Sequence, residues 1–166
     1  MTEPQASIRS YLDRELTMFT VEGGYELRYG DQPLATLGDA KHEVEVECVT
    51  RDGSWRFASL RGGNTEARSG SAVVARCRSN LLPGATLTLP DETRLRLRPP
   101  VMGETWRVRR GLRDTVLHMR SPKGPWLVGF GHEARDIYHL PLLTMFALHA
   151  VLVHPGGADF APGGPY

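Results

Sequence analysis

Cysteine is scarce in this chain of 166 residues, which contains only Cys48 and Cys77. Two cysteines cannot form the disulfide framework that stabilises small secreted domains. Both lie in segments where apolar and polar residues alternate, so we expect buried free thiols in a reducing compartment rather than a bridge. The first 16 residues contain no apolar segment of the signal-peptide kind. A cytoplasmic location is therefore expected.

Lysine is nearly absent as well, since Lys41 and Lys123 are the only two and the other 18 basic residues are arginines. The formal net charge is +1, which gives no overall electrostatic argument for a nucleic-acid partner. The charge is unevenly distributed along the chain. Residues 1–55 hold eleven acids and five bases, a net charge of −6, whereas residues 56–166 hold eight acids and fifteen bases, a net charge of +7.

No apolar run is long enough to cross a bilayer. The longest spans residues 137–153, which is 17 residues against the roughly 20 that a spanning helix needs, and it contains His139, Pro141 and His149. We therefore predict a buried helix and no transmembrane span. Pro141 is tolerated in the first turn, and Asp136 is a candidate N-cap.

Short segments of alternating apolar and polar residues fill most of the chain between residue 16 and residue 130. In the segment 42–49, HEVEVECV, the pattern places Val44, Val46 and Cys48 on one face and the glutamates on the other. The segment 61–69, RGGNTEARS, is predicted to be a polar loop. Connections this short imply antiparallel pairing, because a parallel crossover needs a dozen or more residues.

These elements predict a mainly β fold, a closed antiparallel β-barrel of about 10–12 strands around a buried C-terminal hydrophobic helix. The helix is apolar on nearly all sides, which suits a helix enclosed by a sheet, and closure removes the exposed sheet edges. The predicted organisation is an N-terminal lead-in at 1–15, a barrel at 16–154 with its helix at about 137–153, and a flexible Gly/Pro-rich tail at 155–166.

The strand series from residue 67 to residue 130, followed directly by DIYHLPLLTMFALHAVLVH, resembles the tubby C-terminal-like fold. That group includes the tubby domains, the LURP-one-related proteins and the phospholipid scramblases, and the segment 71–124 is similar to its bacterial relatives. The resemblance implies binding of phosphoinositide head groups through basic side chains on the outer barrel surface. It carries over only arginines on an outward strand face, and the scramblase type of tail is absent.

An arginine-rich segment is the candidate ligand site. Between Arg94 and Arg113 the only carboxylate is that of Glu104. If Leu95 and Leu97 face the core, alternation turns the neighbouring arginines outward, and guanidinium groups suit phosphate. The predicted site comprises Arg94, Arg96, Arg98, Arg107, Arg109, Arg110 and Arg113. The alternative is that these arginines are solvated or pair with the acidic strand of Glu43, Glu45 and Glu47.

Signatures of catalysis, metal binding and cofactor binding are weak. His132 and Glu133 begin HEARD, which lacks the second histidine of a zinc-protease HExxH motif. Alternation places Arg76 and Arg78 on the face opposite Cys77, so no activated thiol is expected. We therefore predict no enzyme, no metal and no cofactor.

The sequence predicts a non-catalytic cytoplasmic domain that meets anionic phospholipid head groups or another phosphate ligand through the arginine face, peripherally at the membrane surface. The alternative is a protein-interaction or scaffold domain with a charge-split surface. A small ligand in the barrel mouth is a third hypothesis, although the helix is expected to fill that space.

Overall fold

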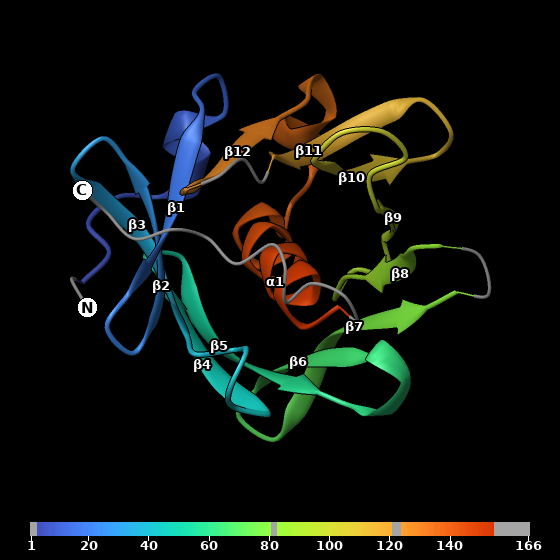
Figure 1. Cartoon of the computed structure of the whole chain (residues 1–166), viewed down its shortest axis with the longest axis horizontal. Helices are drawn as coiled ribbons and strands as arrows, with labels where there is room; N and C mark the ends of the chain where they lie inside the picture. The colour runs from blue at the N-terminus through green and yellow to red at the C-terminus, as the bar shows by residue number, and fades with distance from the viewer. Residues whose placement is uncertain (1–2, 81–82, 121–123, 155–166) are drawn as a thin grey trace.

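A computed structural model describes residues 3–80, 83–120 and 124–154 of the chain. Its strands form one closed antiparallel barrel, as the sequence predicts (Figure 1). The strands are β1 (Leu16–Val21), β2 (Gly24–Tyr29), β3 (Gln32–Gly38), β4 (Glu45–Thr50), β5 (Gly53–Ser59), β6 (Thr65–Ser69), β7 (Ala72–Ser79), β8 (Ala85–Thr88), β9 (Arg94–Arg98), β10 (Thr105–Arg110), β11 (Asp114–Arg120) and β12 (Trp126–Phe130). The helices are η1 (Ile8–Tyr11), η2 (Arg61–Gly63), η3 (His132–Asp136) and α1 (Leu140–Val153), of which the first three are 3-10 helices.

Each strand pairs with the next one along the chain, and β12 returns to pair with β1. The closing seam joins Leu16 to Val128, Thr17 to Leu127 and Met18 to Trp126. Because every connection reverses the chain, successive connections lie at alternate ends of the barrel. The connection between β4 and β5 therefore lies at one end, and the connection between β9 and β10 lies at the other.

Helix α1 runs through the middle of the barrel, as Figure 1 shows. Every residue of α1 except Val153 is buried, which confirms the predicted enclosed helix. The predicted start was wrong: the helix begins at Leu140, three residues later than expected. Asp136 is not its N-cap but the last residue of η3, and His139 precedes the helix without a side-chain cap.

Two local predictions on the strands were also wrong. The segment 61–69 contains β6, whose inward residues Thr65 and Ala67 are buried but too small to produce a clear hydrophobic signal. Val44 is 70% exposed, because β4 begins only at Glu45 and the residue before it lies outside the alternation.

In the hairpin of β8 and β9, Leu87 lies opposite Leu95. Ala85 lies opposite Leu97, and Leu89 is buried beyond the end of β8.

The N-terminal segment covers one end of the barrel. Ile8 on η1 is fully buried, and the backbone N–H of Gln5 donates to the carbonyl of Pro33 at 3.2 Å. The side chain of Arg51 in turn donates to the carbonyl of Gln5 at 2.7 Å. The segment predicted as a lead-in thus packs on the barrel. The predicted tail, 155–166, lies outside the described residues.

The barrel interior is filled by one continuous hydrophobic cluster that includes both cysteines. Cys48 and Cys77 are buried free thiols, as the sequence predicts. Trp106 and Trp126 are buried in the same cluster, and Trp55 packs against it. None of the helices in the described part of the chain is long and apolar enough to cross a membrane.

Candidate functional site

The outer face of β9 and β10 carries the predicted arginines. Leu95, Leu97 and Val108 are buried in the barrel, so the alternation turns the side chains between them outward. The register places Arg98 directly opposite Arg107 and Arg96 directly opposite Arg109. Two neighbouring cross-strand pairs therefore bring like charges together, an arrangement that destabilises a sheet.

A facing pair of arginines elsewhere in the barrel has the carboxylate partners that the pairs on β9 and β10 lack among the described residues. Arg56 on β5 lies opposite Arg68 on β6. Each has a glutamate partner, since Arg56 lies 3.5 Å from Glu45 and Arg68 forms an ion pair with Glu66. Within the described ranges, no ion pair neutralises any of the seven predicted arginines.

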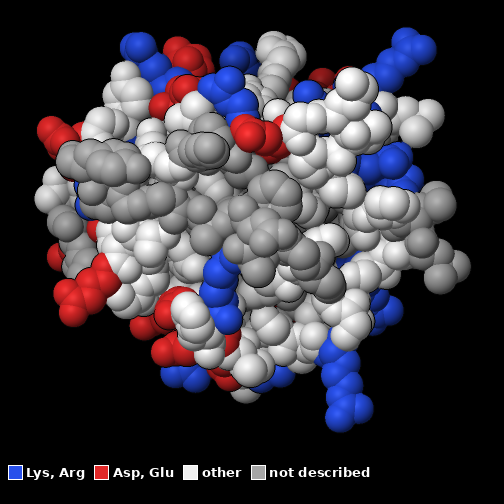
Figure 2. Space-filling model, viewed as in Figure 1, with Lys and Arg blue, Asp and Glu red and all other residues white. Residues whose placement is uncertain are grey.

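The sequence left open whether these arginines pair with Glu43, Glu45 and Glu47, and among the described residues they do not. In the barrel order, β4 is separated from β9 by the four strands β5 to β8. Glu45 is instead paired with Arg56. Figure 2 shows carboxylates mostly over the side formed by β2 to β5, while basic side chains project from the side of β8 to β10.

The structure brings only some of the seven arginines into one site. Arg98, Arg107 and Arg109 line a surface hollow of about 430 Å³, together with residues 99–101 and Pro83. Arg96 adjoins it through its register with Arg109. The remaining three predicted residues lie toward the other end of the strands, and these are Arg94, Arg110 and Arg113.

The guanidinium of Arg109, which borders the hollow, is not fully hydrogen-bonded. Its Nε is buried and makes no hydrogen bond to any residue that the structure describes. A buried N–H without an acceptor is costly. The loop beside the hollow also exposes Val101 at 97% and Met102 at 90% of their surfaces.

Sequence reasoning missed neighbours that extend the basic face across further strands. The register connects Arg78 on β7 to Thr86 on β8, and Thr86 to Arg96 on β9. His118 on β11 lies opposite Arg107, although no sequence pattern groups the two residues. Burial lowers the pKa of His118, and the nearby guanidinium of Arg107 acts in the same direction, against the opposing effect of Glu15.

The two buried thiols are not activated as nucleophiles. Burial raises the pKa of Cys77 to about 11 and raises the pKa of Cys48 further, so both thiols stay protonated near neutral pH. Across the described residues, no group of three or more histidine, cysteine or carboxylate side chains could hold a metal ion.

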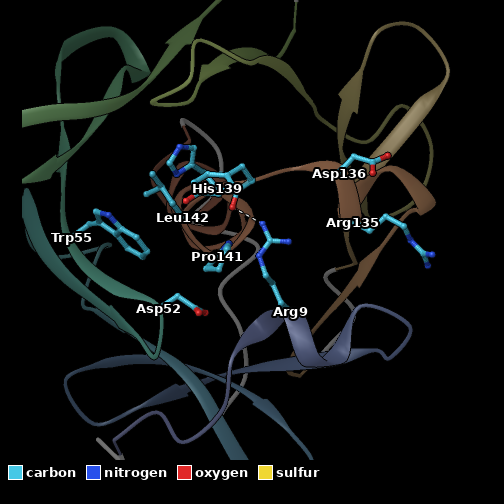
Figure 3. A pocket seen from close by; sticks show the side chains of 9 residues that line it. Arg9, Asp52, Trp55, Arg135, Asp136, His139, Pro141 and Leu142 are labelled. Carbon is cyan, nitrogen blue, oxygen red and sulfur yellow. Dashed lines mark hydrogen bonds between the residues drawn. The ribbon is translucent and has the colours of Figure 1, made fainter.

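A second hollow lies at the end of the barrel where α1 begins, between Trp55 and Arg9 (Figure 3). The sequence predicted that the helix would fill this mouth, and no motif pointed to a site there.

Comparison of the chain with protein-family models, with curated proteins and with solved structures finds no match. The resemblance to the tubby C-terminal-like fold therefore stays a prediction that rests on the strand series and the enclosed helix.

Proposed function

We propose that this chain is a non-catalytic, cytoplasmic barrel domain that binds the phosphate groups of anionic phospholipids at the membrane surface. The observation that carries the proposal is that Arg96 and Arg98 on β9 face Arg109 and Arg107 on β10 in register, with no ion-pair partner among the described residues. Guanidinium groups bind phosphate through two parallel hydrogen bonds, and the hollow presents three of them from two strands.

The loop between β9 and β10 supports a bilayer over a free phosphate compound as the ligand. Val101 and Met102 are almost fully exposed next to the arginines, where a soluble ligand gives them nothing to pack against. At a bilayer these two side chains enter the apolar boundary region while the arginines meet the head groups. Burying an apolar side chain of this size contributes about 1.5–3 kcal/mol, and each basic residue near an anionic leaflet contributes about 1 kcal/mol.

Vesicle co-sedimentation tests the proposal, with phosphatidylcholine vesicles that either contain or lack phosphatidylserine. We expect binding only to the anionic vesicles, and we expect it to weaken as salt is raised. The double variant Arg98→Gln/Arg107→Gln removes two contacts of about 1 kcal/mol each and is expected to bind roughly thirtyfold more weakly.

The matched control is Arg56→Gln/Arg68→Gln, which removes another facing pair of arginines and the same total charge. It is expected to bind nearly as well as the unaltered chain, because those arginines are already paired with glutamates. Equal losses in the two double variants, or equal binding to neutral and anionic vesicles, would contradict the proposal. A salt-sensitive dimer that ignores vesicles would favour a protein-interaction domain instead.

A separate variant tests the role of the loop between β9 and β10. Val101→Ser/Met102→Ser is expected to weaken vesicle binding while leaving the charge of the hollow unchanged. If this variant binds as well as the unaltered chain, and soluble pyrophosphate competes fully with vesicles, the ligand is a free phosphate compound rather than a bilayer.

A further inference from the structure

The mouth of the barrel at the start of α1 contains a hollow of about 510 Å³, within the range of small-molecule sites. The helix begins only at Leu140, and Tyr138 and His139, which precede it, border the hollow. It lies at the opposite end of the barrel from the loop of Val101 and Met102, since it borders the β4–β5 connection. The two sites can therefore be tested separately.

Two opposite charges face this hollow from different elements. Arg9 reaches from η1 toward the first turn of α1, and Asp52 faces it from the β4–β5 turn (Figure 3). They form no ion pair with each other, because the structure places no carboxylate oxygen of Asp52 within 4.0 Å of the guanidinium. The space between them can therefore accept a ligand that carries both charges.

Each of these groups is held in place and keeps free bonding capacity. One terminal nitrogen of Arg9 donates to the backbone carbonyls of Ile137 and Tyr138, while its other N–H groups bond no described residue. Asp52 accepts a hydrogen bond from the Ser7 hydroxyl at 2.6 Å on Oδ2, which leaves Oδ1 available. The first turn of α1 contains no acidic residue and no side-chain cap, so it adds to the attraction for an anion beside Arg9.

Apolar side chains form part of the lining between the two charges. Trp55 forms one wall, and Pro141 and Leu142 lie between it and Arg9 (Figure 3). An indole face attracts an ammonium group, and Trp55 stands on the side of Asp52. Arg135 and Asp136 also border the hollow, but their side chains point away from its centre in the same view.

We propose that this mouth binds a small zwitterion of the amino-acid class with a flat apolar side chain. The carboxylate lies against Arg9 and the start of α1, the ammonium lies between Asp52 and Trp55, and the apolar body packs on Pro141 and Leu142. A compound that carries only one of the two charges leaves either Arg9 or Asp52 without its partner.

Isothermal titration calorimetry with three related compounds tests this assignment on the unaltered chain. The probes are L-phenylalanine, 3-phenylpropionate, which lacks the ammonium, and phenethylamine, which lacks the carboxylate. We expect L-phenylalanine to bind, and we expect each single-charge compound to bind roughly tenfold more weakly, because one charge-assisted contact is lost.

The variant Asp52→Asn sharpens the test, since the amide oxygen can still accept from Ser7. It is expected to weaken L-phenylalanine and phenethylamine about tenfold and to leave 3-phenylpropionate unchanged. Asp136→Asn is the matched control, the same chemical change at a carboxylate that points away, and it is expected to change none of the three.

The assignment is overturned if L-phenylalanine releases no heat at millimolar concentration or if 3-phenylpropionate binds equally well. It is also overturned if the two asparagine variants behave alike. The comparison of ligands uses only the unaltered chain, so it decides the question even if a variant fails to fold. Vesicle binding through β9 and β10 is expected to be unaffected by Asp52→Asn.

Discussion

His149 is a polar residue placed where the fold provides no polar partner. Its side chain is fully buried on α1 against Phe57 and Phe146, with ring centroids 5.3 and 6.5 Å away. Neither ring nitrogen has a hydrogen-bond partner in the described structure. Burial lowers the pKa of His149 from 6.5 to about 4, because the charged imidazolium would lose its hydration inside the barrel.

This depressed pKa predicts that the barrel loses stability in mild acid. The unfolded chain takes up a proton at His149 below about pH 6.5, whereas the folded chain resists protonation until about pH 4. The free energy of unfolding is therefore unaffected by His149 above pH 6.5. It falls as the pH drops from 6.5 to about 4, by about 3 kcal/mol in total. Urea denaturation from pH 4 to pH 7 measures it.

His149→Leu is expected to flatten this pH dependence, and the exposed His132→Asn is the control that should retain it. An unchanged slope in His149→Leu would show that other groups cause the acid sensitivity.

At the scale of elements, the sequence predicted that α1 exists and is buried, but it did not predict the residue at which α1 begins. The helix is apolar on nearly all sides, so it must be enclosed on all sides, and its central position follows from its composition. The start depends on residues 132–139, where η3 forms first and the carbonyls of Ile137 and Tyr138 bond the side chain of Arg9. That partner lies 128 residues away, and no local pattern could reveal it.

A charge inside α1 should prevent folding altogether. Leu148 is fully buried at the centre of the barrel, so Leu148→Asp places a carboxylate where the interior offers it no hydration. We expect the variant to lack the cooperative unfolding transition and the near-ultraviolet circular dichroism of the native chain.

Leu148→Met keeps the apolar character and is the control, expected to lose less than about 1.5 kcal/mol. A folded, soluble Leu148→Asp would show that α1 is misplaced.

At the scale of the whole molecule, the barrel depends on its closing seam. Three residue pairs join β1 to β12, as few as join β3 to β4 or β9 to β10, and this pairing of the first strand with the last closes the barrel. Thr17 lies at the middle of this seam and is paired on both sides, with Leu127 and with Arg28. Opening the seam creates two sheet edges, which are prone to pair with other chains.

Thr17→Pro is therefore expected to destabilise the barrel by about 3 kcal/mol or more and to cause aggregation, since proline removes a ladder donor from a strand paired on both sides. Thr17→Val, which keeps the strand preference, should remain monomeric by light scattering and melt near the unaltered chain. If Thr17→Pro unfolds like Thr17→Val, the seam does not limit stability.

The candidate site was predictable only in part, for a similar reason. Alternation around Leu95, Leu97 and Val108 was enough to turn the arginines outward. Alternation does not determine register, so it could not show which arginines face one another or that Arg94, Arg110 and Arg113 lie apart from the hollow. The partner of Arg56 likewise depended on the pairing of β4 with β5.

The sequence by itself determined that alternating strands enclose one apolar helix, because hydrophobic periodicity is local and burial follows from it. It also determined that the two thiols are buried and that an arginine-rich face points outward. Only the tertiary structure decided that Arg98 and Arg107 face each other without a carboxylate partner among the described residues, and that Arg9 and Asp52 share the open mouth. Strand register decides the first arrangement, which alternation alone cannot predict. The second joins residues far apart in the chain, which the packing of η1 at the mouth of the barrel brings together.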